Sequence, residues 1–320
     1  MPDRIAAAYY YASDAGGFDL LNAPLQHLTH LIASFADVSV DGLAVWAPDD
    51  ATLAAKTKFP GLKLLLAVGG WTWSARFSEA SLTAASRRRF ASSALELMEK
   101  HGFDGFDVDW EFPVVGGLPD NVRRPEDREN FTLLLEELRS TFDTAEARLG
   151  RRLSLSVATG ANRPQIEALE TDSFHRFIDW MNLMTYDFHG SWNAEPGDNS
   201  SLADTEAAVR LYLERGFPAG KIVVGTPLYA HQWLKDGAGW KAGPVLFWNA
   251  AEALRTPGNF VWDDKRGASR LVEAHRVLTW DSDEALTAKA ALVRRLGLGG
   301  LMTWQVSGDP EGRQLARLAL

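Results

Sequence analysis

Short apolar runs recur along the chain and alternate with segments of helical periodicity. Each run is bounded by glycine, proline or charged residues, which is typical of buried strands. Between the runs lie segments such as 129–142, whose apolar residues recur at the three-, four- and seven-residue spacing of an amphipathic helix. The predicted strands are 5–12, 28–38, 62–70, 103–112, 152–160, 179–188, 221–230 and 297–305.

This alternation predicts the fold class. Strands that alternate with helices form parallel βα units, and eight such units predict an α/β fold of the closed (β/α)8 TIM-barrel kind. We expect one domain over residues 1–320. One connection is too long for a simple unit: about 65 residues separate Tyr229 from Gly297, where a loop and a helix need about 30. A short insertion is therefore expected between the seventh and eighth strands, at about 231–275.

Composition narrows the function classes. A net charge of −9 disfavours nucleic acid or an anionic membrane as partner, and no apolar run reaches the length of a membrane span. The absence of cysteine excludes disulfides, thiolate nucleophiles and cysteine metal sites. We expect a monomer. The opening residues show no signal-peptide pattern, so the two readings of location are a cytoplasmic protein and the mature part of an exported one.

Tryptophan is the one unusual residue type, with twelve in the chain. Two interpretations remain open: a tryptophan-rich core, or a carbohydrate cleft in which flat indole faces stack on sugar rings.

The stretch 104–113, DGFDVDWEFP, carries the candidate chemistry. Side chains alternate along a strand, so Asp107, Asp109 and Glu111 share the face toward the barrel axis, with Glu111 at the carboxyl-terminal mouth. Carboxyls this close cannot all be ionised cheaply, so at least one pKa should rise into the range of a general acid. Asp104 has the opposite parity and is expected to be structural.

The acidic strand has two other interpretations. A divalent-cation site is disfavoured because no histidine accompanies the acids and because such sites usually lie on turns. An inert acidic edge is disfavoured because bulky apolar residues flank the three aligned acids. We therefore expect neither metal nor cofactor.

DGFDVDWEFP resembles the catalytic strand of the glycoside hydrolase family 18 chitinases. Four further segments resemble that family's third, sixth, seventh and eighth strands, in the correct order over nearly the whole chain. They are AVGGWTWS, MTYDFHGSW, GTPLYA and GGLMTWQVSGD.

The resemblance implies a substrate-assisted mechanism, an exception to the usual pair of enzyme carboxylates. Glu111 would protonate the glycosidic oxygen, while the 2-acetamido oxygen of the substrate attacks the anomeric carbon. Asp109 would bind the acetamide N–H, Asp107 would set the charge and orientation of Asp109, and Tyr186 would position the acetamido oxygen. The resemblance also implies substrate-binding residues, of which Tyr10 and Phe35 fit a plain core role equally well: Trp304, Asp187, Met184, Trp71, Tyr10, Phe35 and Tyr229.

The sequence departs from the family pattern after GTPLYA, where Ala230 and His231 replace a glycine and an arginine. His231 either contacts the ligand or is structural. The insertion is also shorter than in members with a deep cleft, so a lower wall and internal cleavage are expected.

The implied function is a chitinase that cleaves β-1,4 linkages of chitin and N-acetylglucosamine oligosaccharides with retention. The alternatives are an endo-β-N-acetylglucosaminidase acting on N-glycan cores, and a non-catalytic chitin-binding lectin of the same fold. The presence of Glu111 argues against the lectin.

Overall fold

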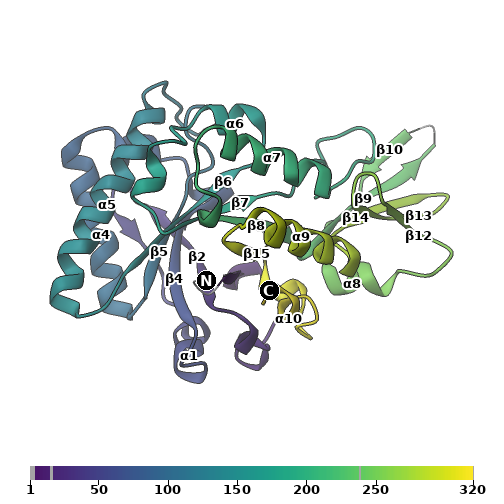
Figure 1. Cartoon of the computed structure of the whole chain (residues 1–320), viewed down its shortest axis with the longest axis horizontal. Helices are drawn as coiled ribbons and strands as arrows, with labels where there is room; N and C mark the ends of the chain where they lie inside the picture. Colours follow the sequence, from purple (N-terminus) through teal and green to yellow (C-terminus); the bar gives the residue numbers. More distant parts are fainter. Residues whose placement is uncertain (1–3, 15–16, 238, 320) are drawn as a thin grey trace.

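A closed parallel barrel forms the body of the protein (Figure 1). The computed structural model describes residues 4–14, 17–237 and 239–319. Within these, parallel pairing runs around a ring of eight strands, and the pairing of the first two strands closes it. This confirms the predicted (β/α)8 fold. The strands are β1 (Ile5–Tyr11), β2 (His30–Val38), β4 (Lys63–Gly69), β5 (Gly105–Asp109), β6 (Ser154–Gly160), β7 (Trp180–Met184), β8 (Ile222–Pro227) and β15 (Gly300–Trp304).

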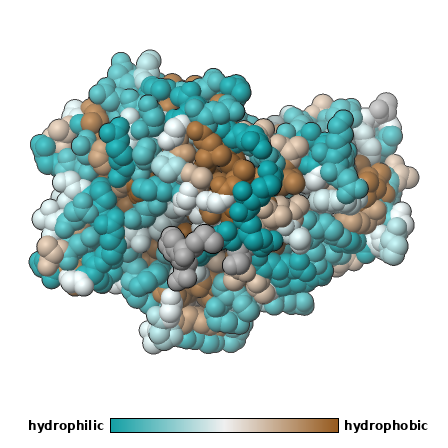
Figure 2. Space-filling view, in the orientation of Figure 1, coloured by the Kyte–Doolittle hydropathy of each residue, from teal (hydrophilic) through white to brown (hydrophobic). Residues whose placement is uncertain are grey.

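Helices surround the barrel, and the predicted helix 129–142 lies within the longest of them. Hydrophilic residues cover most of the outer face that Figure 2 presents. No helix among the described residues is long and apolar enough to cross a membrane. The helices are α1 (Asp50–Lys58), α2 (Gly70–Trp73), α3 (Phe77–Ser81), α4 (Ala84–His101), α5 (Asp127–Leu149), α6 (Arg163–Glu167), α7 (Leu202–Glu214), α9 (Asp283–Leu296) and α10 (Leu315–Leu318).

Strand alternation divides the buried side chains into two cores. Residues that point outward, such as Phe106 and Val108 of β5, pack beneath the helices in the larger core. Residues that point inward build a smaller core around the barrel axis, which includes Tyr9 and Trp180. Asp107 and Asp109 have the inward parity, so the fold brings both carboxyls to the axis of the barrel.

The insertion between β8 and β15 is a separate antiparallel sheet, seen at the right of Figure 1. Its elements run from 229 to 280, beyond the expected 231–275. The predicted strand 221–230 is divided, because β8 ends at Pro227 and the chain joins the second sheet from Tyr229. The elements are β9 (Tyr229–Asp236), β10 (Gly239–Ala242), β11 (Leu246–Phe247), α8 (Trp248–Ala253), β12 (Phe260–Asp263), β13 (Ala268–Val272) and β14 (Arg276–Trp280); a short β3 (Ala44–Val45) pairs with β2.

Ion pairs fasten the insertion to the barrel. Arg266 and Arg270 both pair with Asp198, a buried residue in the segment that follows β7. A buried carboxylate between two guanidinium groups is well compensated, because each pair supplies charge-assisted hydrogen bonds. The sheet is therefore anchored beside the mouth of the barrel.

Candidate active site

Strand β5 places the acidic residues in a column at the barrel axis. Asp107 is fully buried and accepts three hydrogen bonds from different strands. Tyr9 Oη donates to its Oδ2 at 2.9 Å, while Ser156 Oγ and Asn182 Nδ2 donate to its Oδ1 at 2.5 and 3.1 Å. These three neutral donors favour the ionised form of Asp107, which opposes the effect of burial.

Glu111 lies two residues beyond the end of β5, on backbone that is held from both sides. Its N–H donates to Ser74 Oγ at 2.9 Å, and its carbonyl oxygen accepts from Asn121 Nδ2 at 3.0 Å. Gly117 approaches the same carbonyl so closely, at a φ of +74°, that an added Cβ would lie 2.3 Å from the oxygen. Only glycine fits there, which fixes the path of the segment that carries the acid.

The environment raises the pKa of all three carboxyls. Burial raises the pKa of Asp107 to about 6, against the lowering effect of its hydrogen-bond donors. Burial, followed by the charges of Glu111 and Asp107, raises the pKa of Asp109 well above its ordinary value. Burial and the charge of Asp187 raise the pKa of Glu111 to about 8. Glu111 is therefore protonated at neutral pH.

Asp109 offers an open acceptor beside a neutral phenol. Its Oδ1 is buried and has no hydrogen-bond partner among the residues that the structure describes. Tyr186 lines the same cavity, and burial raises its pKa well above the ordinary value, so its hydroxyl keeps its proton. A buried polar atom without a partner is costly, which favours a ligand group at this position. The described residues include no cluster of His, Asp and Glu suited to a metal ion.

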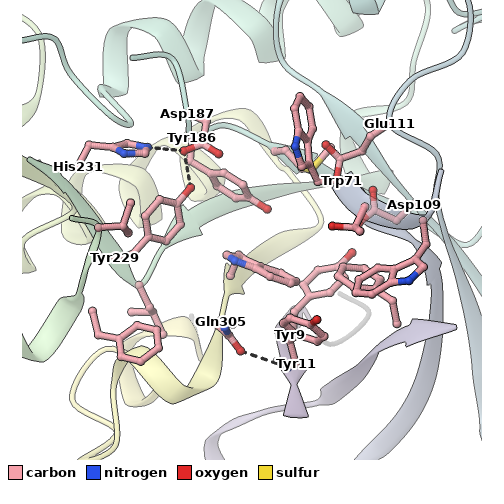
Figure 3. Close-up of a pocket in the computed structure, with 18 residues that line it drawn as sticks. Tyr9, Tyr11, Trp71, Asp109, Glu111, Tyr186, Asp187, Tyr229, His231 and Gln305 are labelled. Atoms are coloured by element: carbon pink, nitrogen blue, oxygen red, sulfur yellow. Dashed lines mark hydrogen bonds and ion pairs between the residues drawn. The ribbon is translucent and has the colours of Figure 1, made fainter. Parts of the chain in front are cut away.

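The cleft above the acids has two lobes, the first of which Figure 3 shows. The first lobe has a volume of about 360 Å³ and the second about 660 Å³. Glu111 lies where they meet. Both lobes share Trp71, Glu111, Met184, Tyr186 and Asp187; the first adds Tyr9, Tyr11, Phe35, Trp73, Asp109, Tyr229, His231 and Trp304, and the second adds Phe112, Asn162, Gln165, Ser191 and Trp192.

Aromatic rings from three strands and α2 pack together in the first lobe. The ring of Trp304 stacks on that of Phe35 with centroids 5.4 Å apart and lies 5.7 Å from that of Tyr9. Tyr11 and Trp73 pack against Phe35 at 6.0 and 5.8 Å. The faces of such rings offer apolar surfaces of the kind on which sugar rings stack.

Most residues singled out from the sequence meet in this cleft. Those that line it are Glu111, Asp109, Tyr186, Asp187, Met184, Trp71, Phe35, Tyr229 and Trp304, together with His231. Asp107 lies beneath Asp109, outside the lining residues. Asp104 is structural, as expected, because it binds Lys56 and the backbone N–H of Leu64.

Of the two roles left open for Tyr10, the structure shows the plain core role and not the substrate-binding one. Tyr10 points away from the barrel axis, is 5% exposed and packs against Phe18. Its neighbours Tyr9 and Tyr11 have the inward parity and line the first lobe. The register of β1 against β2 and β15 decides which of the three consecutive tyrosines faces inward.

Several site residues were not identified from the sequence. Tyr9 and Tyr11 belong to a run of three consecutive tyrosines, which gives no signal for which of them face inward, whereas Trp192 lies within the quoted MTYDFHGSW motif. Ser156 and Asn182 gave no local signal. They reach Asp107 only because β6 and β7 are the next strands of the barrel, with Ser156 directly beside Asp107.

A (β/α)8 barrel with buried carboxyls at its strand ends, beneath an aromatic cleft, defines a site suited to a carbohydrate-cleaving enzyme. The model for glycosyl hydrolases family 18 matches residues 6–309. The chain therefore belongs to this family.

Individual relatives agree with the family. Chitinase A1 of Niallia circulans is 36% identical over 286 residues, which cover 78% of this chain but 41% of that protein. Chitotriosidase-1 of Mus musculus is 33% identical over 327 residues, 88% of this chain and 67% of that protein. A solved family 18 N-acetylglucosaminidase from Paenibacillus barengoltzii covers 99% of both chains with a TM-score of 0.87 and 28% identity. The chain thus spans less than half the length of Chitinase A1.

Proposed function

We propose that this chain is a chitinase that hydrolyses β-1,4 linkages between N-acetylglucosamine units with retention of configuration. The observation that carries the proposal is the position of Glu111: it lies where the two lobes meet, and its pKa of about 8 keeps it protonated at neutral pH. The names of Chitinase A1 and chitotriosidase-1 support the substrate class.

In the first step, one sugar occupies the first lobe and the leaving sugar occupies the second. Glu111 donates its proton to the oxygen between them as the bond to the anomeric carbon breaks. The carbonyl oxygen of the substrate's own acetamido group attacks that carbon and closes an oxazolinium ring. No carboxylate of the protein forms a bond to the sugar.

Asp109 and Tyr186 prepare the acetamido group for this attack. The unpartnered Oδ1 of Asp109 accepts the acetamide N–H, and the Tyr186 hydroxyl donates to the acetamido oxygen. Positive charge develops on the ring as it closes, and it develops beside the Asp109 carboxyl. This interaction is stronger in the transition state than in the ground state, which is what accelerates the step.

In the second step, the leaving sugar departs and Glu111 is left ionised. It takes a proton from a water molecule that attacks the anomeric carbon from the side the leaving group has vacated, so the configuration is retained. Trp304 supports the reacting sugar from below, because its indole is part of the aromatic surface of the first lobe.

Analysis of the products from chitotetraose and chitohexaose tests the proposal. Proton NMR during the first minutes should show β-anomers at the new reducing ends. A protein that binds these oligomers without cleaving them would be a lectin. A protein that leaves them intact but cleaves the core of an N-glycan would be an endo-β-N-acetylglucosaminidase.

A further inference from the structure

Asp187 borders both lobes of the cleft and is held in an unusual backbone conformation. Its φ is +58°, and its N–H donates to Asn199 Oδ1 at 2.9 Å. A residue other than glycine is strained at this φ, so the surrounding contacts must fix it there. The side chain is 45% exposed, which leaves it accessible to a ligand.

Two donors meet on one oxygen of this carboxylate. Tyr229 Oη and His231 Nε2 each donate to Asp187 Oδ1 at 2.7 Å, as Figure 3 shows. None of the described residues donates to Oδ2. These two hydrogen bonds therefore fix the rotation of the Asp187 carboxylate. Its other oxygen is left able to accept a hydrogen bond from a ligand in the cleft.

His231 also contacts Trp192, a residue that lines the second lobe. Its ring packs edge-on against the indole of Trp192, with centroids 5.5 Å apart, while Trp192 itself is 60% exposed. On its other side, His231 packs at 6.3 Å from Trp233, whose Nε1–H donates to the carbonyl oxygen of Asn193 at 3.3 Å. The residue thus joins β9 of the insertion to the segment that carries Asp187 and Trp192.

Because His231 is buried, the loss of its hydrogen-bond partner would be costly in free energy. Its side chain is 8% exposed, so a lost partner could not be replaced freely by water. Its position on β9 also faces the cleft, because Tyr229, His231 and Trp233 share one side of that strand.

We infer that His231 is a positioning residue for substrate binding, an inference that rests on the proposed chitinase function. It orients Asp187, so that Oδ2 accepts a hydroxyl group of an N-acetylglucosamine unit. It acts on affinity rather than on the proton transfer, which belongs to Glu111. This resolves the choice between a ligand contact and a structural role: His231 is structural in position and acts through Asp187.

A double-mutant cycle on the full chain tests this role. His231→Ala should raise KM for chitotetraose about tenfold, the effect expected for losing a hydrogen bond to a charged group, while kcat changes less than about threefold. Asp187→Ala should raise KM similarly. In the Asp187→Ala background, His231→Ala should add little, because the two residues act as one unit.

Conservative and matched variants complete the test. His231→Gln keeps a donor and should restore most of the lost affinity. His275→Ala, on the exposed turn before β14, should leave KM unchanged. Affinity for chitotetraose measured calorimetrically in the Glu111→Gln background, with and without His231→Gln or His231→Ala, gives a readout that does not need turnover. Thermal unfolding of each variant confirms that it is folded.

The outcomes separate the two claims. If wild type cleaves chitotetraose but the KM effects of His231→Ala and Asp187→Ala simply multiply, or if kcat falls and KM does not rise, the inference is wrong and the proposed function stands. If wild type leaves every N-acetylglucosamine oligomer intact, the proposed function fails and the inference fails with it. If His231→Ala does not fold, the affinities of the His231→Gln and His231→Asn variants decide. The inference is wrong if both variants lose the same affinity for chitotetraose and if they lose it equally when Asp187 is also replaced by alanine.

Discussion

The indole Nε1–H of Trp180 donates a hydrogen bond to Oδ1 of Asn182 at 3.0 Å, between two buried side chains on β7. Because an indole nitrogen can only donate, this bond sets which end of the amide faces Trp180. The Nδ2 group is left facing Asp107 and Tyr9, to which it lies at 3.1 and 3.0 Å. Trp180 thereby ensures that the carboxylate of Asp107 faces the N–H donor of Asn182 and not its carbonyl oxygen.

Replacing Trp180 by phenylalanine should destabilise the protein. The change keeps an aromatic ring but leaves Asn182 Oδ1 buried without its donor, a loss of about 1–3 kcal/mol in the free energy of unfolding. Urea unfolding measures it. Trp46→Phe is the matched control, since the contacts of Trp46 are ring contacts with His101 and Phe103, and it should cost less. Equal losses in the two variants would show that the bond to Asn182 is not the cause.

Glu111→Gln should lower kcat on chitotetraose at least 10²-fold while binding of oligomers persists. The amide has nearly the shape of the acid but has no proton to give. Steady-state kinetics and calorimetric binding provide the two measurements, and circular dichroism checks the fold. Turnover close to that of wild type would overturn the assignment of Glu111 as general acid.

Activity should fall as the pH rises through about 8, because the proposed mechanism requires the protonated form of Glu111 and the pKa of Glu111 is raised to about 8. The same shift affects stability. A carboxyl whose folded pKa is raised binds protons more tightly in the native state, so its contribution is complete below pH 4.5 and is lost as the pH approaches 8.

Urea unfolding from pH 5 to 9 checks the stability effect, with Glu111→Gln as the control that lacks this proton. The decline in unfolding free energy with pH should be shallower in the variant. Identical slopes, or a kcat/KM profile that keeps rising above pH 9, would contradict the raised pKa of Glu111.

The proposed mechanism requires the substrate to supply its own acetamido group at the sugar on the non-reducing side of the cut. Fully deacetylated chitosan should be nearly inert and cellulose untouched, because Asp109 and Tyr186 have nothing to position there. Partially acetylated chitosan should yield new reducing ends that are almost all N-acetylated. Sequencing of these products is the measurement, and frequent glucosamine at the new ends would mean that the protein provides a nucleophile.

Cleavage should occur inside the chain of a soluble oligomer. Glu111 lies between two lobes, so sugars can bind on both sides of the cut, and the larger lobe lies on the leaving side. Chitohexaose sampled at the earliest times should therefore give products of several lengths. Exclusive early release of one short product, single N-acetylglucosamine or disaccharide, would instead indicate an exo mode.

The sequence predicted the barrel because its signals are local. The runs 62–70 and 152–160 differ from β4 and β6 by no more than two residues at either end. Alternation along β5 likewise predicted the shared face of Asp107 and Asp109. Features that depend on distant pairing have no such local signal. Three consecutive tyrosines do not reveal which of them face inward, and the split at Pro227 follows from the pairing of β9 with β14.

The hydroxyl group of Ser74 links two segments that line the cleft. Its Oγ accepts the N–H of Glu111 and lies 2.7 Å from the carbonyl oxygen of Gly70 and 3.1 Å from that of Asp109. Gly70 begins the short helix that carries Trp71, so the segments that carry Glu111 and Trp71 are both hydrogen-bonded to this one oxygen. A movement of the barrel mouth that displaces one of these two residues should therefore displace the other as well, which keeps their relative position constant.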